Sequence, residues 1–275
     1  MLSILERSQS WWRHYVPYRL QFLVRSILDL TDVRSSVRFL LDFSLPVSFV
    51  TRLRYVGSIY RTSYRVDCAH TQSEILECAA ALLSFGGSPQ AVFVEAGCYK
   101  GGSAAKFSAA ARLVGRDFVA FDSFEGLPAN DEQHGATIQG DKPRFDEGRY
   151  RGSLEEVEAN IRTYGSIESS QLVKGWFDQT MPAFSRPIAV AYLDVDLVSS
   201  TRTCLRHLYP LLEPGGSIYS QDAHLPLIID LLRTDAFWRE EVGCETPAIE
   251  GLGSRKLVRI TKRHQQQHPA SAAAE

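Results

Sequence analysis

The sequence has no apolar run long enough to cross a membrane and no cysteine pattern that would build a disulfide framework. No stretch of about 18 uncharged apolar residues occurs in the chain, which excludes a membrane-spanning helix. The five cysteines are widely spaced and form no C-x-x-C pair, so we expect neither a zinc site nor structural disulfides. This cysteine usage is typical of a reducing compartment, and we predict a cytoplasmic location without a signal peptide.

The chain also lacks a strong overall charge. Lysine and arginine total 30 against 32 acids, a net charge of −2, which argues against a nucleic-acid partner. Residues 1–65 nevertheless carry ten arginines, no lysine and only four acids. We interpret this segment as a basic, aromatic-rich helical extension that docks on the rest of the chain or on a second subunit, giving a homo-oligomer. Peripheral contact with a membrane surface is the less favoured alternative.

Between residues 66 and 262, short apolar runs alternate with amphipathic helical patterns. Capping boxes at Thr71-Gln-Ser-Glu74 and Ser153-Leu-Glu-Glu156 predict the starts of two helices. The alternation predicts one α/β domain with a mostly parallel sheet covered on both faces. The segment from 242 to 261 is typical of two strands joined by a glycine loop, which adds an antiparallel hairpin. Runs typical of the earlier strands lie at 91–95, 118–122, 171–174, 188–194 and 217–219.

Two segments of the chain show no regular period. Residues 129–152 follow a predicted strand end, where open α/β sheets bind ligands, so we favour a functional lid over a disordered loop. Residues 263–275 are polar and alanine-rich, which predicts a disordered tail.

A glycine-rich turn follows the first predicted strand, with the order Gly97-Cys-Tyr-Lys-Gly101-Gly102. Such a turn lets a ligand approach the backbone at a helix N-terminus. It matches neither G-x-G-x-x-G nor a Walker-type loop, which weakens a dinucleotide interpretation. Glu95 suits a cationic amine and Asp122 suits a ribose diol, and S-adenosylmethionine (SAM) carries both groups. The alternative is that the glycines only shape the turn.

Acidic residues gather where two later strands end. Asp194 and Asp196 are two apart on a strand, so their carboxylates face the same way and require a cation or a shared proton. Gln221 and Asp222 end the next strand, which we expect to be its neighbour. Asp194, Gln221 and Asp222 can then converge as hard oxygen ligands suited to Mg²⁺. The alternative gives these acids helix-capping roles.

Aromatic residues follow the third predicted strand. Trp176 and Phe177 would lie beside Asp122 and could stack on a nucleobase, or could equally be part of the core.

Five motifs in this order resemble the macrocin O-methyltransferase family, a branch of the class I SAM-dependent methyltransferases that acts mainly on sugar hydroxyls of natural products. The resemblance extends from about His70 to Ile260. It rests on Glu-Ala-Gly-Cys-Tyr-Lys-Gly-Gly-Ser (95–103), Phe-Asp-Ser-Phe-Glu-Gly-Leu-Pro (121–128), Gly-Trp-Phe-Asp-Gln-Thr-Met-Pro (175–182), Asp-Val-Asp-Leu-Val-Ser-Ser-Thr (194–201) and Pro-Gly-Gly-Ser-Ile-Tyr-Ser-Gln-Asp (214–222).

This resemblance implies a Rossmann-like class I methyltransferase fold, with a seven-stranded sheet that ends in a C-terminal antiparallel hairpin. It places SAM over the first two strand ends and a Mg²⁺ ion that holds the acceptor sugar. Asp194 matches the family's first metal aspartate, and Asp196 matches its proposed general base. Gln221 stands where the best-known members have aspartate, which removes one negative charge and lowers the expected metal affinity.

We therefore predict methyl transfer from SAM to a hydroxyl, on a sugar of a small-molecule natural product. Asp196 is the candidate base and His224 its rival, while Asp194, Gln221 and Asp222 are the candidate metal ligands. The alternatives are a non-catalytic SAM-fold binding protein and an NAD(P)-dependent sugar oxidoreductase, which would need a Tyr-x-x-x-Lys or equivalent site that the sequence lacks. Candidate cofactor-binding residues are Glu95, Gly97, Tyr99, Gly101, Ser103, Asp122, Ser123, Trp176 and Phe177.

Overall fold

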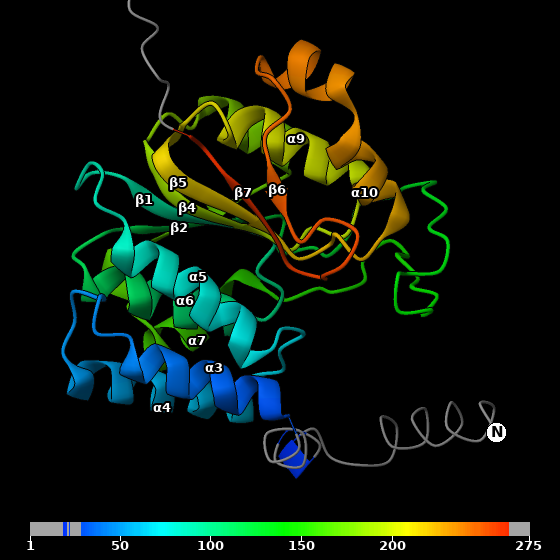
Figure 1. The fold of residues 1–275 in the computed structure, drawn as a ribbon. Coiled ribbons are helices and arrows are strands. Elements are labelled where there is room, and N and C mark those ends of the chain that lie inside the picture. The colour runs from blue at the N-terminus through cyan, green and yellow to red at the C-terminus, as the bar shows by residue number, and fades with distance from the viewer. Residues whose placement is uncertain (1–18, 21, 23–28, 264–275) are drawn as a thin grey trace, which may run out of the picture.

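The computed structural model of this chain describes residues 19–20, 22 and 29–263. The predicted tail therefore lies outside the described residues except for Arg263, as does most of the segment before residue 29. Within the described part, a seven-stranded sheet forms in the order β3-β2-β1-β4-β5-β7-β6. Helices cover both faces, with α5, α6 and α7 on one side and α9 and α10 on the other (Figure 1). The predicted fold is confirmed.

The predicted strands of the parallel part are all present. β1 pairs in parallel with β2 and β4, β2 with β3, and β4 with β5. β5 begins five residues before the predicted run, because Pro214, Gly215 and Gly216 obscure the strand pattern there. The strand bounds are Val92–Ala96 (β1), Phe118–Asp122 (β2), Ser170–Lys174 (β3), Ile188–Leu193 (β4), Leu212–Ser220 (β5), Ile249–Glu250 (β6) and Val258–Thr261 (β7).

The predicted first strand of the C-terminal hairpin is mostly wrong. Its first residue, Val242, ends a π-helix, Phe237–Val242, residues 243–248 have no regular structure, and only its last residue enters the two-residue strand β6. Trp238 is fully buried in that turn, and its indole nitrogen donates to the carbonyl of Leu232 at 2.8 Å. The apolar residues there pack into the core as a helical turn rather than alternating along a strand. The hairpin itself forms, with β7 antiparallel to both β5 and β6.

Helix starts follow the capping signals. At Thr71 the capping box is complete, because Oγ1 accepts from the N–H of Glu74 at 3.2 Å and Glu74 Oε2 accepts from the N–H of Thr71 at 2.7 Å. At Ser153 only the first half forms, to the N–H of Glu156. The helix bounds are Leu30–Leu41 (α3), Phe49–Arg65 (α4), Gln72–Ser84 (α5), Gly102–Leu113 (α6), Leu154–Tyr164 (α7), Phe177–Thr180 (α8), Val198–Leu208 (α9) and Pro226–Arg233 (α10).

The N-terminal helices α3 and α4 form a further layer outside α5 and α6 (Figure 1). Phe39, Tyr55 and Ile59 pack into the same apolar cluster as α5, α6 and the lower face of the sheet. This agrees with docking of the extension on the rest of the chain. Among the described residues, no helix is both long and apolar enough to span a bilayer.

The capping box at Thr71 generates a stability prediction. Replacing Thr71 with alanine leaves the N–H of Glu74 without its acceptor, so the free energy of unfolding should fall by about 1 kcal/mol. Urea denaturation followed by circular dichroism measures the change. Thr163→Ala on the exposed face of α7 is the matched control and should change stability by less than about 0.5 kcal/mol. Equal effects at the two sites would contradict the capping assignment.

Candidate functional site

A cavity of about 680 Å³ opens at the carboxyl ends of the parallel strands. Its volume lies in the range of small-molecule sites, roughly 300 to 1,000 Å³. Its lining joins the turn after β1, the ends of β2, β4 and β5, and the loop after β3. Of the predicted site residues, it includes Gly97, Tyr99, Ser103, Asp122, Ser123, Trp176, Phe177, Asp194, Asp196, Asp222 and His224.

The glycine turn after β1 forms one wall of this cavity. Gly97 has φ +84°, and a Cβ at this position would lie 2.0 Å from the carbonyl oxygen of Asp194, so no other residue fits. Gly101 caps α6 in the left-handed region at φ +78° and packs against Val157 instead of lining the cavity. The turn therefore shapes the chain and, at Gly97, also lines the cavity, while its contact with a ligand stays a prediction.

Glu95 lies behind the turn rather than in the cavity. Its side chain is fully buried, and neither carboxylate oxygen has a hydrogen-bond partner among the described residues. Burial raises the pKa of Glu95 well above its usual value, and the nearby hydroxyl of Ser103 offsets this only in part. The predicted contact with a ligand amine is thus not a direct feature of the cavity wall.

Asp122 ends β2 with its carboxylate at the cavity. Its Oδ2 accepts from the N–H of Cys98 and its Oδ1 from the N–H of Phe124, both at 2.7 Å. Burial raises the pKa of Asp122 while these backbone bonds lower it. Since each carboxylate oxygen has two lone pairs, both can still accept from a ligand. A fixed acceptor pair of this kind suits a vicinal diol.

Trp176 and Phe177 lie beside Asp122 because the N–H of Gly175 donates to the carbonyl of Asp122 at 3.0 Å. Both aromatic side chains line the cavity, and Phe177 also packs against the upper core. Phe177 thus packs against the core as one alternative held, while stacking of Trp176 or Phe177 on a nucleobase stays a prediction.

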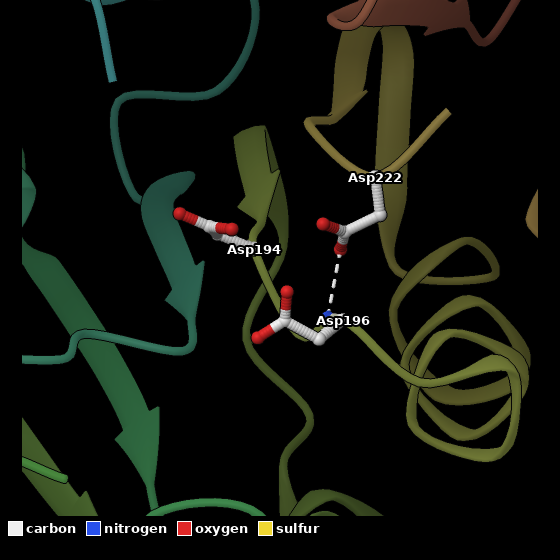
Figure 2. A group of neighbouring side chains, drawn as sticks. All are labelled: Asp194, Asp196 and Asp222. Atoms are coloured by element: carbon white, nitrogen blue, oxygen red, sulfur yellow. Dashed lines mark hydrogen bonds between the residues drawn. The ribbon is translucent and has the colours of Figure 1, made fainter. Parts of the chain in front are cut away.

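Three carboxylates converge where β4 and β5 end (Figure 2). Asp194, Asp196 and Asp222 each offer one oxygen, and these oxygens lie within 4.8 Å of one another. Oδ2 of Asp222 accepts from the N–H groups of Val195 and Asp196 at 2.9 and 3.0 Å. Asp196 itself has φ +63°, a strained conformation for a non-glycine residue. The Asp222 carboxylate therefore anchors the bend that carries the other two.

The cluster has an excess of negative charge. Burial and the neighbouring Asp222 raise the pKa of Asp194 to about 7, and burial with both other carboxylates raises that of Asp196 well above its usual value. Lys256, from the loop before β7, lines the cavity and lowers the pKa of all three aspartates. Hard oxygen donors with uncompensated charge suit a divalent cation such as Mg²⁺, so the residues present fit the metal that the resemblance implies.

Gln221, predicted as a metal ligand, is fully buried and does not line the cavity. The amide orientation that satisfies its neighbours donates to Oδ2 of Asp194 at 2.6 Å and accepts from Nζ of Lys256 at 3.1 Å. It also contacts the hydroxyl of Tyr192. The structure therefore places Gln221 behind Asp194 as an orienting group, and Asp196 in its place as the third oxygen of the cluster.

The segment 129–152 lies against the site. Glu132 accepts from the N–H groups of Val198 and Ser199 at 2.7 and 2.9 Å, at the N-terminus of α9. The N–H of Ile138 donates to the carbonyl of His224 at 3.0 Å. Pro143, Phe145 and Tyr150 line the cavity. The segment therefore borders the cavity, and its role as a lid stays a prediction.

Sequence reasoning missed several cavity residues with charge or hydrogen-bonding capacity, among them His70 and Lys256. Lys256 follows a glycine loop in the hairpin, and His70 precedes α5. Neither belongs to a strand end, so no pattern in the sequence indicates that either faces the site.

Sequence comparison identifies the family. Residues 77–247, more than half of the chain, match the model of the Macrocin-O-methyltransferase (TylF) family. The chain belongs to the macrocin O-methyltransferase family. The resemblance drawn from the five motifs is thus confirmed.

Two curated relatives come from streptomycetes. The 8-demethyl-8-(2,3-dimethoxy-alpha-L-rhamnosyl)-tetracenomycin-C 4'-O-methyltransferase of Streptomyces olivaceus is 33% identical over 168 residues, which covers 58% of this chain and 63% of that protein. The demethyldecarbamoylnovobiocin O-methyltransferase of Streptomyces niveus is 33% identical over 137 residues, covering 47% of this chain and 51% of that protein. The chain thus spans less than two thirds of the length of either relative.

Solved structures share the fold. The O-methyltransferase NovP superposes with a TM-score of 0.61 at 23% identity, covering 78% of this chain and all of that chain. The calicheamicin methyltransferase CalS11 gives 0.53 at 18% identity, covering 84% of this chain and 91% of that chain.

Crowding of the three carboxylates generates a prediction for Asp194→Asn. Removing one like charge should raise the thermal midpoint of the metal-free protein by a few degrees at pH 8. It should also abolish the further rise that MgCl₂ produces in the wild type. Differential scanning calorimetry with and without MgCl₂ measures both effects. Asp230→Asn on the exposed face of α10 is the control and should behave as wild type. An undiminished response of Asp194→Asn to MgCl₂ would contradict a metal site here.

Proposed function

We propose that this protein transfers the methyl group of SAM to a hydroxyl of a glycosylated small molecule, in natural-product biosynthesis. Family membership supports the reaction class, and the sugar-linked names of the curated relatives support the acceptor class. The single observation that carries the proposal is that one cavity joins the glycine turn and Asp122 to the carboxylate cluster. SAM and the acceptor, which need different binding groups, can therefore bind next to each other in one cavity.

On the cofactor side, the chain's own groups recognise an adenosine. Asp122 accepts from the ribose hydroxyls, and Trp176 with Phe177 offers an apolar surface for the base. The left-handed turn at Gly97 brings backbone to the ligand without a side chain in between. Holding SAM in this way, next to a bound acceptor, supplies the alignment that a methyl transfer requires.

On the acceptor side, Asp196 takes the proton from the attacking hydroxyl. Burial and the adjacent carboxylates raise the pKa of Asp196, which makes the ionised form a stronger base. His224 is the rival base. Its Nδ1 lies 3.2 Å from the carbonyl of Gln221. Burial and Lys256 lower the pKa of His224, which leaves Nε2 able to accept a proton.

A divalent ion, with Mg²⁺ favoured, fits beside this base, held by the carboxylates of Asp194 and Asp222. When bound, such an ion lowers the pKa of a coordinated hydroxyl and fixes neighbouring sugar oxygens. Gln221 keeps Asp194 oriented through its amide N–H. The same amide contributes no negative charge, so we propose a weaker metal affinity than an aspartate at this position would give.

Buried free thiols at Cys78, Cys98 and Cys204 support the proposed cytoplasmic location, because reducing conditions preserve such groups.

The test of the proposed base is Asp196→Asn. Asparagine keeps the size of the side chain but cannot take a proton, so turnover should fall at least ~10²-fold while SAM affinity stays within about twofold. Methylation of a panel of glycosides with labelled SAM measures turnover, and calorimetric titration measures affinity. Asp230→Asn is the matched control. Near-normal turnover in Asp196→Asn would move the role to His224, and absence of transfer to any glycoside together with retained SAM binding would favour a non-catalytic binding protein.

We further propose that a second copy of the chain docks on the outer face of α3 and α4. Leu30, Val33, Val37 and Leu41 form one stripe along α3 and are 64%, 44%, 49% and 55% exposed. Phe43, at 80% exposure, extends this apolar stripe toward α4. A continuous exposed apolar face of this kind on the outer helical layer is typical of a protein–protein interface.

Val37→Glu tests this interface. A charge at the centre of the stripe should convert a dimer to a monomer, which halves the mass measured by light scattering after size exclusion. Thr163→Glu on α7 is the control and should leave the mass unchanged. A monomeric wild type that binds anionic liposomes, with binding lost in Val37→Glu, would instead support the membrane alternative.

A further inference from the structure

Lys256 is the only lysine or arginine among the described residues that line the cavity. It is half-buried in the loop between β6 and β7. The same lining holds six aspartates, and three of them form the carboxylate cluster at the ends of β4 and β5 (Figure 2). Lys256 therefore supplies the ammonium that the described part of the lining sets against these carboxylates.

A single buried amide links Lys256 to the cluster. In the orientation that satisfies its neighbours, Gln221 donates to Oδ2 of Asp194 at 2.6 Å and accepts from Nζ of Lys256 at 3.1 Å. Gln221 is fully buried, so water does not compete for these hydrogen bonds. Because the amide is neutral, it holds the ammonium next to the cluster without cancelling the charge of the ammonium.

The charge of Lys256 acts on the cluster through space. Its Nζ forms no ion pair with a carboxylate among the residues that the structure describes. Burial raises the pKa of all three clustered aspartates, and the ammonium opposes this rise in each of them. A positive charge that stabilises the ionised carboxylates also repels a second cation at the same oxygens.

We propose that Lys256 is a resident counter-cation of the carboxylate cluster, which opposes the binding of a divalent ion and so sets the Mg²⁺ concentration at which the site fills. This role rests on the proposed function, because the ion is the one proposed for the acceptor side. It differs from the effect of Gln221, which only lacks a negative charge. Lys256 adds a positive charge from another loop, and the two residues can be changed independently.

The test compares variants of Lys256 that remove or keep the charge. Methionine removes the charge, so calorimetric titration of chelator-treated Lys256→Met with MgCl₂ should give an affinity on the order of tenfold or more above that of the wild type. Lys256→Arg keeps the charge and should stay close to the wild type. Lys174→Met, at the exposed end of β3 outside the cavity, is the matched control and should also leave the affinity unchanged.

Thermal stability gives a second readout that does not depend on turnover. Without MgCl₂, the cluster in Lys256→Met has lost its counter-charge, so the thermal midpoint should lie below that of the wild type. Added MgCl₂ should then raise the midpoint of Lys256→Met by more than it raises that of the wild type, because a tighter ligand stabilises the folded state more. Lys256→Gln, a second neutral variant, should repeat both results and replaces Lys256→Met if methionine prevents folding.

The pattern across the variants separates charge from loop geometry. An affinity for Mg²⁺ in the neutral variants that is equal to or below that of the wild type would overturn the proposal. A similar rise in Lys256→Arg would overturn it too, because the charge is still present there. If no protein responds to MgCl₂, both this role and the proposed metal are wrong, whereas methyl transfer is judged separately by titration of the wild type with SAM.

Discussion

The site depends on how closely the main chain at Gly97 approaches the main chain at Asp194. The N–H of Asp194 donates to the carbonyl of Ala96 at 3.0 Å, and the N–H of Gln221 donates to the carbonyl of Leu193 at 2.9 Å. These bonds continue the sheet beyond its strands, so the ends of β1, β4 and β5 stay in register. The glycine turn and the carboxylate cluster are thereby held at a fixed separation. A larger residue at 97 would force them apart.

The cavity is most acidic where β4 and β5 end, because three carboxylates gather there. Asp67 and Asp122 add two more carboxylates to its lining. Lys256 moderates the acidic end without neutralising it, which leaves that end with capacity for a cation.

The sequence predicted the site best where residues with chemical roles lie at the ends of strands. The fully buried strand β4 appears as an uninterrupted apolar run, and the acids that end β2 or follow β4 line the cavity, whereas Glu95 within β1 does not. Prediction failed where packing decides the outcome. Phe237 and Trp238 fill the upper core in a π-helix, where the indole N–H of Trp238 donates to the carbonyl of Leu232 in α10. Gln221 occupies a ligand's position in the chain, yet its side chain turns toward Tyr192. Lys256 and His70 come from loops, whose path across the cavity no periodicity describes.

The contact between Glu132 and the start of α9 makes closure of the segment 129–152 part of the stability of that helix. Burial raises the pKa of Glu132, but hydrogen bonds from Ser199 and Val198 outweigh burial and lower this pKa. The contact therefore requires the ionised carboxylate. If this segment lifts, both N–H groups lose their cap, at a cost of about 1 kcal/mol. Any ligand whose binding displaces the segment has to compensate for that loss through its own contacts.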